Sequence, residues 1–214
     1  MIFLVAALLA ILSYAYGSLS TARIITKSFR SLNIYKVGSG LADTENIYSN
    51  ISKPLGVLVG ALDVVKSYVF LLIVETILRV ISNVDTPYNF SVLYSSTVLL
   101  GFGVIMLTGH CLPITNKFRG GRGIFTYMGL IGYFAFYPML ITAIIAVLLV
   151  TIYRQIRFAQ YLIVILPAIL AQVFYSFFSV FRKELPPHFL VILLGVAFFM
   201  GILNIIVSKR LGEF

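Results

Sequence analysis

Residues 118–123, with the sequence FRGGRG, combine two arginines with three closely spaced glycines. A guanidinium group donates several N–H bonds in a planar fork that fits a phosphate, and glycine lets backbone N–H groups approach an anion closely. A loop that only orients membrane helices needs the positive charges but not these glycines. The segment therefore predicts a phosphate cradle formed by Arg122 and the backbone N–H groups of Gly120, Gly121 and Gly123.

A second glycine-containing stretch, VGSGLADTEN at residues 37–46, carries further polar groups. Gly38 and Gly40 flank Ser39, whose hydroxyl is a hydrogen-bond donor, and Asn46 follows. Successive backbone N–H groups in such a segment can form an anion-binding nest. The alternative, which this short pattern leaves open, is a flexible loop that leads into the next helix.

Two charged residues and one histidine lie within or next to apolar segments. Asp63 and Lys66 are spaced i, i+3, so they share one face of a helix, and we expect a coupled pair that points into a helix bundle. The alternative to a functional role is a neutralising pair that fixes helix packing. We expect His110 to be a structural residue rather than a base. No zinc signature is present, and the other histidine, His188, lies in a distant loop, so no metal site is expected.

The composition indicates what kind of protein positions these groups. Hydrophobic residues make up 60% of the 214 residues, charged residues only 11%, and the mean hydropathy is +1.04, whereas soluble domains carry about 25% charged residues. The chain is therefore predicted to be an integral membrane protein. A net charge of +9 would suggest nucleic acid for a soluble protein, but here the bases cluster in short loops between apolar segments. No nucleic-acid partner is expected.

Seven apolar segments are candidates for membrane helices. The fourth and fifth are short and meet near Pro138, so one kinked helix is an alternative to two. The first is an apolar run without the positive n-region of a cleaved signal peptide, and we interpret it as a membrane span. The segments lie at residues 1–16, 54–81, 91–108, 123–135, 138–152, 159–180 and 188–207.

The distribution of positive charge favours seven separate spans. With the N-terminus outside, this topology puts twelve of the sixteen lysines and arginines in the cytoplasm, against ten for six spans. Residues 17–53 and 109–122 then face the cytoplasm, and residues 82–90 face outward. The predicted fold class is an all-α polytopic membrane protein with seven transmembrane helices, the N-terminus outside and the C-terminus cytoplasmic. Residues 1–214 are predicted to form a single integral membrane domain.

Four motifs occur together in a fixed order. They are Gly17–Ser18, GSGxxxxxN from Gly38 to Asn46, DxxK from Asp63 to Lys66, and GHxxPxxxxFxGGRGxxT from Gly109 to Thr126. In order and separation they resemble the motifs of the bacterial acyl-phosphate-dependent glycerol-3-phosphate acyltransferases, the PlsY family.

The resemblance implies a seven-helix enzyme of the bacterial inner membrane that needs no cofactor. Such an enzyme transfers an acyl group from acyl phosphate to the 1-hydroxyl of glycerol 3-phosphate, giving lysophosphatidic acid for phospholipid synthesis. Its partners are these two substrates and membrane lipids. The expected catalytic residues are Ser39 and Arg122. The expected substrate- and phosphate-binding residues are Gly38, Gly40, Asn46, Gly120, Gly121, Gly123 and Thr126. The expected supporting residues are His110, Asp63 and Lys66.

The first loop departs from the family pattern, which is close to GSGNxGATNxxR. Leu41, Asp43, Glu45 and Ser49 stand where this pattern has Asn, Gly, Thr and Arg, and Tyr35 and Arg122 stand where the family has Arg and Lys. The loop thus loses two cations and gains two carboxylates, which should repel a phosphate dianion. These changes favour the alternative hypothesis of a catalytically silent or altered-substrate member that acts as a membrane partner or scaffold.

Overall fold

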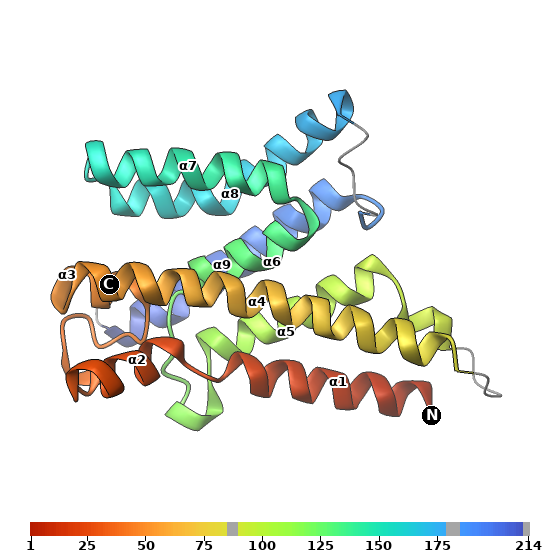
Figure 1. Cartoon of the computed structure of the whole chain (residues 1–214), viewed down its shortest axis with the longest axis horizontal. Helices are drawn as coiled ribbons and strands as arrows, with labels where there is room; N and C mark the ends of the chain where they lie inside the picture. Colours follow the sequence, from red (N-terminus) through yellow and green to blue (C-terminus); the bar gives the residue numbers. More distant parts are fainter. Residues whose placement is uncertain (85–89, 179–184, 212–214) are drawn as a thin grey trace.

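A computed structural model describes residues 1–84, 90–178 and 185–211 (Figure 1). In this part of the chain all regular structure is helical. The helices are α1 (Ile2–Gly17), α2 (Thr21–Arg30), η1 (Ile34–Lys36), α3 (Thr44–Asn50), α4 (Lys53–Ser82), η2 (Phe90–Leu93), α5 (Ser96–Cys111), η3 (Ile114–Asn116), α6 (Ile124–Phe134), α7 (Phe136–Ile152), α8 (Ile156–Phe177) and α9 (Phe189–Leu211).

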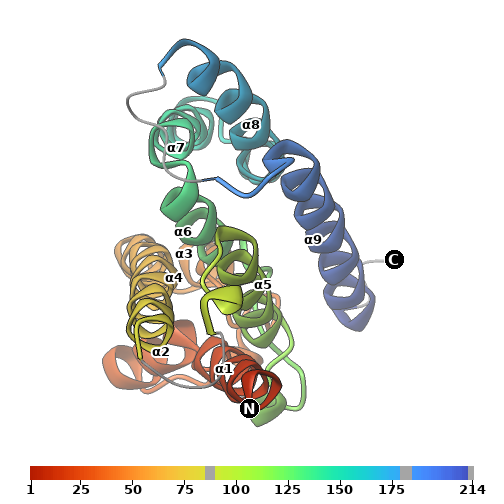
Figure 2. The ribbon, with the colours of Figure 1, turned by 90° about the vertical axis from the view of Figure 1, so that its right-hand side faces the viewer.

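The long helices run roughly along one axis of the molecule, and the short helices α2 and α3 lie at one end of it (Figure 1). The chain begins at the opposite end with α1, and α9 finishes at the same end as α2 and α3. Viewed along the bundle, α6 lies between the α1, α4 and α5 group and the α7–α8 pair, and α9 lies to one side (Figure 2). The predicted outward loop at 82–90 falls mostly on residues that the structure does not describe, as do the last two residues of the predicted span 159–180.

The centre of the bundle is α6. Tyr127, Leu130 and Ile131 on this helix are fully buried. A Cβ added at Gly129 would lie 2.0 Å from Ser67 Oγ and 2.1 Å from the Val64 carbonyl oxygen, so the α4 and α6 backbones are in direct contact. Small residues permit such close approach between membrane helices, where dispersion forces and hydrogen bonds drive association.

The contact between α1 and α5 also depends on glycine. A Cβ at Gly17 would lie 1.9 Å from the Met106 carbonyl oxygen, and one at Gly109 would lie 2.2 Å from the Tyr14 carbonyl oxygen. The Tyr14 hydroxyl donates a hydrogen bond to the Leu112 carbonyl at 2.6 Å across the same interface. The two helices therefore meet backbone to backbone where α1 ends and the 109–122 loop begins.

The structure tests two of the expected helix boundaries, the break between the fourth and fifth apolar segments and the start of the third. The helices α6 and α7 are separate, as the seven-segment interpretation predicts, and they break at Ala135. Pro138 lies in the first turn of α7, where its missing N–H removes no helical bond. The expected start of the next-earlier span at residue 91 is wrong: η2 occupies that position, and α5 begins only after Ser95, whose hydroxyl accepts from the Val98 N–H.

Among the residues that the structure describes, five helical segments, including α1 continued through α2, are long and apolar enough to cross a membrane. The shorter apolar helices are α6, with 11 residues, and α7, with 17. The expected loop at 17–53 is partly helical, because Ser20 and Asp43 accept hydrogen bonds from backbone N–H groups at the starts of α2 and α3. These short helices shape the end of the bundle where the two polar loops meet.

Candidate active site

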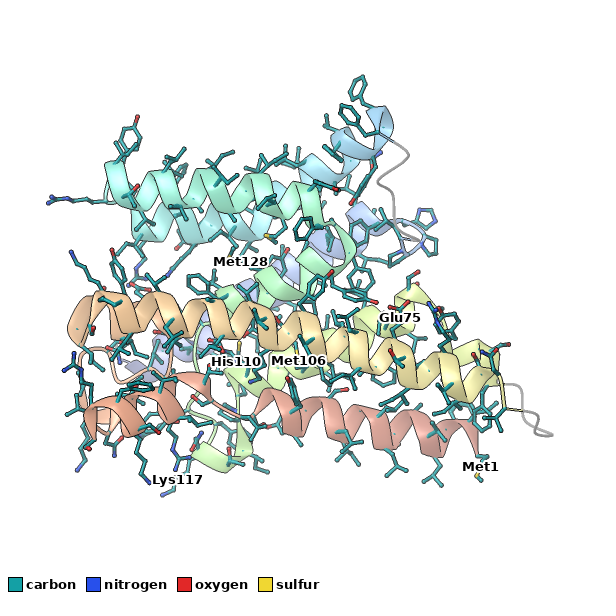
Figure 3. All side chains as sticks on the ribbon, viewed as in Figure 1. Met1, Glu75, Met106, His110, Lys117 and Met128 are labelled. Atoms are coloured by element: carbon teal, nitrogen blue, oxygen red, sulfur yellow. The ribbon has the colours of Figure 1, made fainter. Side chains whose placement is uncertain are left out.

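The two glycine-containing loops identified in the sequence lie against each other at one end of the bundle. The Ala42 N–H donates a hydrogen bond to the Gly120 carbonyl oxygen at 3.4 Å. Arg23 on α2 donates to the side chain of Asn116, just before the second loop. Figure 3 shows His110 in the interior near this end and Lys117 at its surface, while Glu75 lies toward the other end. The structure thus brings together residues 37–46 and 118–123, as a shared site requires.

Asn46 organises the first loop from within. Its side-chain amide donates to the carbonyl oxygens of Val37, at 3.0 Å, and Leu41, at 2.8 Å, and its Oδ1 accepts from the Ser39 N–H at 3.1 Å and from Asn50 at 3.0 Å. Its exposed fraction is 1%. Asn46 therefore fixes the loop's shape, and its expected contact with a substrate stays a prediction that these internal bonds do not favour.

The glycines on either side of Ser39 have left-handed backbones, with φ of +54° at Gly38 and +70° at Gly40. Residues with a side chain rarely adopt this backbone conformation, so the loop requires glycine at both positions. Ser39 itself is half-buried, and its hydroxyl accepts only a long 3.4 Å bond from the Leu41 N–H. Its expected role toward a substrate stays a prediction.

Arg122 is buried and paired with two carboxylates from the first loop. Its Nη1 lies 3.0 Å from Glu45 Oε2 and 3.6 Å from Asp43 Oδ2. Glu45 Oε2 also accepts a hydrogen bond from Gln160 on α8 at 2.8 Å. A guanidinium has five N–H donors, and both of these contacts are made by Nη1. The arginine joins α3, the start of α6 and, through Glu45, α8.

Asp43 is the more firmly held of the two carboxylates. Its Oδ1 accepts the Asn46 N–H at 2.9 Å and so caps α3. Burial raises the pKa of the Asp43 carboxyl, while the Asn46 N–H and the positive charge of Arg122 act to lower it. Its Oδ2 accepts no hydrogen bond from a described group, although it faces Arg122.

Packing explains the glycines of the second loop in part. A Cβ at Gly120 would lie 2.1 Å from the His110 carbonyl oxygen, and one at Gly121 would lie 2.8 Å from Asp43 Cβ. Positive φ occurs at Gly123, at +76°, but not at Gly120 or Gly121. Gly120 and Gly121 thus allow the loop to press against α5 and the first loop, and their contact with a phosphate stays a prediction.

Two buried polar side chains, one near each end of the second loop, are not satisfied within the described part of the chain. His110 Nδ1 and the Thr126 hydroxyl each lack a hydrogen-bond partner there. Thr126 lies in the first turn of α6, but Gly123 is the N-cap and no side chain caps this helix, so the expected support of the helix start by the Thr126 hydroxyl is not seen. His110 is buried as expected of a structural residue, without the hydrogen bond at Nδ1 that would fix its ring.

A cavity of about 20 Å³ opens beside Arg122. This volume accommodates roughly one water molecule. Its lining combines residues of both loops with groups from five helices, α3, α4, α5, α6 and α8: Asp43, Thr44, Glu45, Asp63, His110, Arg122, Gly123, Ile124, Phe125 and Gln160. In the described part of the chain no group of three His, Cys, Asp or Glu side chains is arranged to hold a metal ion.

The expected pairing of Asp63 with Lys66 is wrong in its partners. Asp63 accepts a hydrogen bond from the Thr21 hydroxyl, and Lys66 Nζ donates to the carbonyl oxygens of Leu19 and, at 3.1 Å, Gly17. In the described part of the chain no ion pair joins the two. Asp63 instead binds the first residue of α2, and Lys66 binds backbone carbonyl oxygens at and just after the end of α1. Asp63 is buried as expected, at 2% exposed, and Lys66 is half-buried.

Lys66→Met should lower the melting temperature of the purified protein in detergent. The change leaves the partly buried Gly17 carbonyl and the exposed Leu19 carbonyl without a charged donor, a loss of about 1.5–3 kcal/mol. The exposed Lys36→Met is the matched control and should change stability by no more than about 0.5 kcal/mol. Equal melting temperatures for wild type and Lys66→Met would contradict this role.

A family model described as glycerol-3-phosphate acyltransferase matches residues 7–210, nearly the whole chain. The chain belongs to the glycerol-3-phosphate acyltransferase family. Among curated relatives, glycerol-3-phosphate acyltransferases from Mycoplasma mycoides and Mycoplasma mobile are 33% identical over 153 residues and 35% identical over 124 residues. Another, from Lactobacillus acidophilus, is 29% identical over 146 residues. The alignments cover 72%, 58% and 68% of this chain and 56%, 48% and 64% of those relatives.

The family fold is also present in a solved structure. The crystal structure of PlsY (YgiH), an integral membrane glycerol 3-phosphate acyltransferase, in its glycerol 3-phosphate form, matches with a TM-score of 0.66 at 24% identity. The match covers 96% of this chain and 88% of that one. Its lysophosphatidic acid form matches with a TM-score of 0.63. Together with the five long apolar helices, this fold makes the present acyltransferase family member a multi-pass membrane protein.

Sequence reasoning missed three side chains of the site in this glycerol-3-phosphate acyltransferase family member. Asp43 and Glu45 were recognised as departures from the family pattern, but not as partners of Arg122. Buried carboxylates require a cation, and this requirement was the available signal. Gln160 could not be identified from the sequence. It is one of several polar residues in the stretch YRQIRFAQY, and this pattern does not indicate which helix face meets the site.

Proposed function

We propose that this chain transfers an acyl group from acyl phosphate to the 1-hydroxyl of glycerol 3-phosphate, giving lysophosphatidic acid. The observation that carries the proposal is the meeting of residues 37–46 and 118–123 around the buried Arg122, in a chain of the glycerol-3-phosphate acyltransferase family. The curated relatives bear that name, and the similar crystal structures are described in glycerol 3-phosphate and lysophosphatidic acid forms.

The reaction makes modest demands on the protein. The acceptor hydroxyl oxygen attacks the acyl carbonyl carbon, the new ester C–O bond forms, and the bond to the phosphate oxygen breaks. Inorganic phosphate leaves, and a phosphate oxygen takes the hydroxyl proton, so no protein base is required. Positioning of the two substrates and stabilisation of developing negative charge then supply the catalysis. Neither requires a metal or an organic cofactor.

In this proposal Arg122 is the cation for a substrate phosphate, and backbone N–H groups of Gly120, Gly121 and Gly123 are further donors. Ser39 orients the reacting group. Gly38 and Gly40 allow the first loop to approach, and Asn46 holds that loop in shape. Since the cavity beside Arg122 has a volume of only about 20 Å³, substrate binding requires the two loops to move apart. The aliphatic chain lies between helices toward the bilayer.

We also propose seven membrane spans, in a bacterial inner membrane, with the N-terminus outside and the C-terminus cytoplasmic. The opposite positions of the start of α1 and the end of α9 support an odd number of crossings (Figure 1). The 11 residues of α6 span about 16 Å, less than the roughly 30 Å of hydrocarbon. Non-helical backbone at Gly123 and Ala135 can continue this crossing because it is buried in protein.

Cysteine labelling tests the orientation. In a Cys111→Ser background, Lys36→Cys should react with a membrane-impermeant thiol reagent only from the cytoplasmic side, and Val92→Cys only from the outside. Both positions are exposed, and the segments that carry them, η1 and η2, lie toward opposite ends of the molecule (Figure 1). Labelling of Val92→Cys from the cytoplasm alone would overturn the orientation.

One observation favours the second candidate, a silent or altered-substrate family member: the carboxylates of Asp43 and Glu45 already contact Arg122. The deciding experiment incubates purified protein in lipid nanodiscs with acyl phosphate and glycerol 3-phosphate and follows lysophosphatidic acid. We expect product that depends on both substrates. A folded protein that makes none, while a known family enzyme under the same conditions does, would favour the silent member.

A further inference from the structure

We propose that Glu45 is a specificity-determining residue: its carboxylate occupies the part of Arg122 that a substrate phosphate engages, and the phosphate must displace it. The inference rests on the proposed function and deepens it. In the resting site the first loop thus supplies its own anion to the cradle.

The contact geometry supports this assignment. Glu45 Oε2 lies 3.0 Å from Arg122 Nη1, a normal charge-assisted hydrogen bond, whereas Asp43 Oδ2 lies 3.6 Å from the same nitrogen. A carboxylate and a phosphate present similar planar pairs of oxygens to a guanidinium, so they compete for the same donors. Glu45 therefore makes the stronger of the two contacts and the one that a phosphate has to replace.

The two carboxylates differ in their freedom to leave. Asp43 is anchored by the hydrogen bond from the Asn46 N–H, and its side chain is 9% exposed. The Glu45 side chain is 22% exposed, and its second partner is the neutral amide of Gln160. Rotation of Glu45 toward solvent lets its charge be hydrated while Asp43 keeps its place as the cap of α3. The displacement consequently needs one side chain to move and does not need α3 to unfold.

The charges around the cavity explain why displacement of Glu45 from Arg122 lowers the affinity for a substrate phosphate. Asp43, Glu45 and Asp63 line it together with the single lining cation Arg122. A phosphate dianion that approaches Arg122 meets these carboxylates at short range, where repulsion is much stronger than in bulk water. Removing the Glu45 charge relieves the repulsion and removes the competitor. Phosphate affinity should rise.

The test compares wild type with Glu45→Gln and Glu45→Thr, the second of which restores the residue type of the family pattern. Steady-state kinetics in nanodiscs measure KM for glycerol 3-phosphate and for acyl phosphate separately. We expect one of these KM values to fall by about tenfold in both variants. This change corresponds to a small part of the Coulomb repulsion between a carboxylate and a neighbouring phosphate dianion in a partly buried site. The substrate whose KM falls is the one that Arg122 holds.

Glu75→Gln is the matched control, because Glu75 is also a half-buried glutamate paired with an arginine, but toward the other end of the bundle (Figure 3). It should leave both KM values unchanged. Unchanged or higher KM values in both Glu45 variants would overturn the proposal. That result is expected if the Glu45 carboxylate only orients Arg122, because its removal would then weaken substrate binding or leave it unchanged.

A binding measurement separates this inference from the proposed function. Inorganic phosphate should raise the melting temperature of Glu45→Gln at concentrations about tenfold lower than those needed by wild type. If no form of the protein transfers acyl groups but this shift is seen, the proposed function fails and the Glu45 assignment stands. If wild type is active and the shift is absent, the Glu45 assignment fails alone.

Discussion

Arg122→Ala should strongly reduce the rate of acyl transfer and should also destabilise the protein. The side chain is 7% exposed and faces Asp43 and Glu45. Its removal leaves the buried Asp43 carboxylate without a cation, and breaking a buried ion pair from one side costs about 3–5 kcal/mol. Independently, loss of one preorganised donor to developing charge costs about 2.7–4 kcal/mol of transition-state stabilisation, which is a rate decrease of about 10² to 10³.

Two further variants separate these effects. Arg122→Lys keeps a cation in the site and restores the residue type of the family pattern, so it should recover much of the stability and part of the activity. Arg119→Ala removes an exposed arginine from the same loop and should have little effect on either. Activity is measured as initial rate per folded protein, and folding by size-exclusion elution and melting temperature. Full activity in a folded Arg122→Ala protein would remove Arg122 from the mechanism.

Gly120→Ala should reduce acyl transfer by about 10²-fold, the effect expected when catalytic groups shift by about 1 Å. The added Cβ would lie 2.1 Å from the His110 carbonyl oxygen and 2.5 Å from that of Cys111. Both are backbone atoms, which cannot rotate away, so the loop that carries Arg122 has to move. Overpacking of this kind also costs about 1–3 kcal/mol of stability.

Gly101→Ala on α5 is the control for the alanine itself, because a Cβ at Gly101 meets no atom within 4 Å. It should leave activity unchanged, and it should keep or raise the melting temperature, since alanine favours helix. The comparison is made on initial rates and melting temperatures at equal detergent concentration. Equal rates for Gly120→Ala and wild type would show that the second loop does not need its close contact with α5.

The helical architecture could be predicted from the sequence because each helix is encoded locally. Apolar runs, charge in the connecting loops and the position of Pro138 predicted the apolar helices of the described part of the chain to within a few residues: α1, α4, α5, α6, α7, α8 and α9. The start of α5 was misplaced because the apolar residues of η2 have the same composition as a helix, and only the cap at Ser95 distinguishes them.

The site could be predicted in its location but not in its pairings. The motifs identified both loops, yet the partners of Arg122 come from a segment 77 residues earlier in the chain. Asp63 and Lys66 were expected to pair because they share a helix face, but Asp63 binds the Thr21 hydroxyl at the start of α2, and Lys66 binds the Gly17 carbonyl at the end of α1. A sequence motif does not indicate which backbone carbonyl or side chain a polar residue contacts, so neither these contacts nor the internal bonds of Asn46 could be predicted.

The close packing of α1 on α5 has a consequence for biogenesis. At Gly17 and Gly109 the backbones of α1 and α5 lie too close together for a side chain on either glycine. Cys111, where α5 ends, is translated about 90 residues after α1 is complete. At roughly 5–20 residues per second this is an interval of about 5 to 20 s. During this interval α1 lacks its α5 partner, and α4, whose Lys66 donates to the carbonyl oxygens of Gly17 and Leu19, is the helix that can hold the end of α1 until α5 is synthesised.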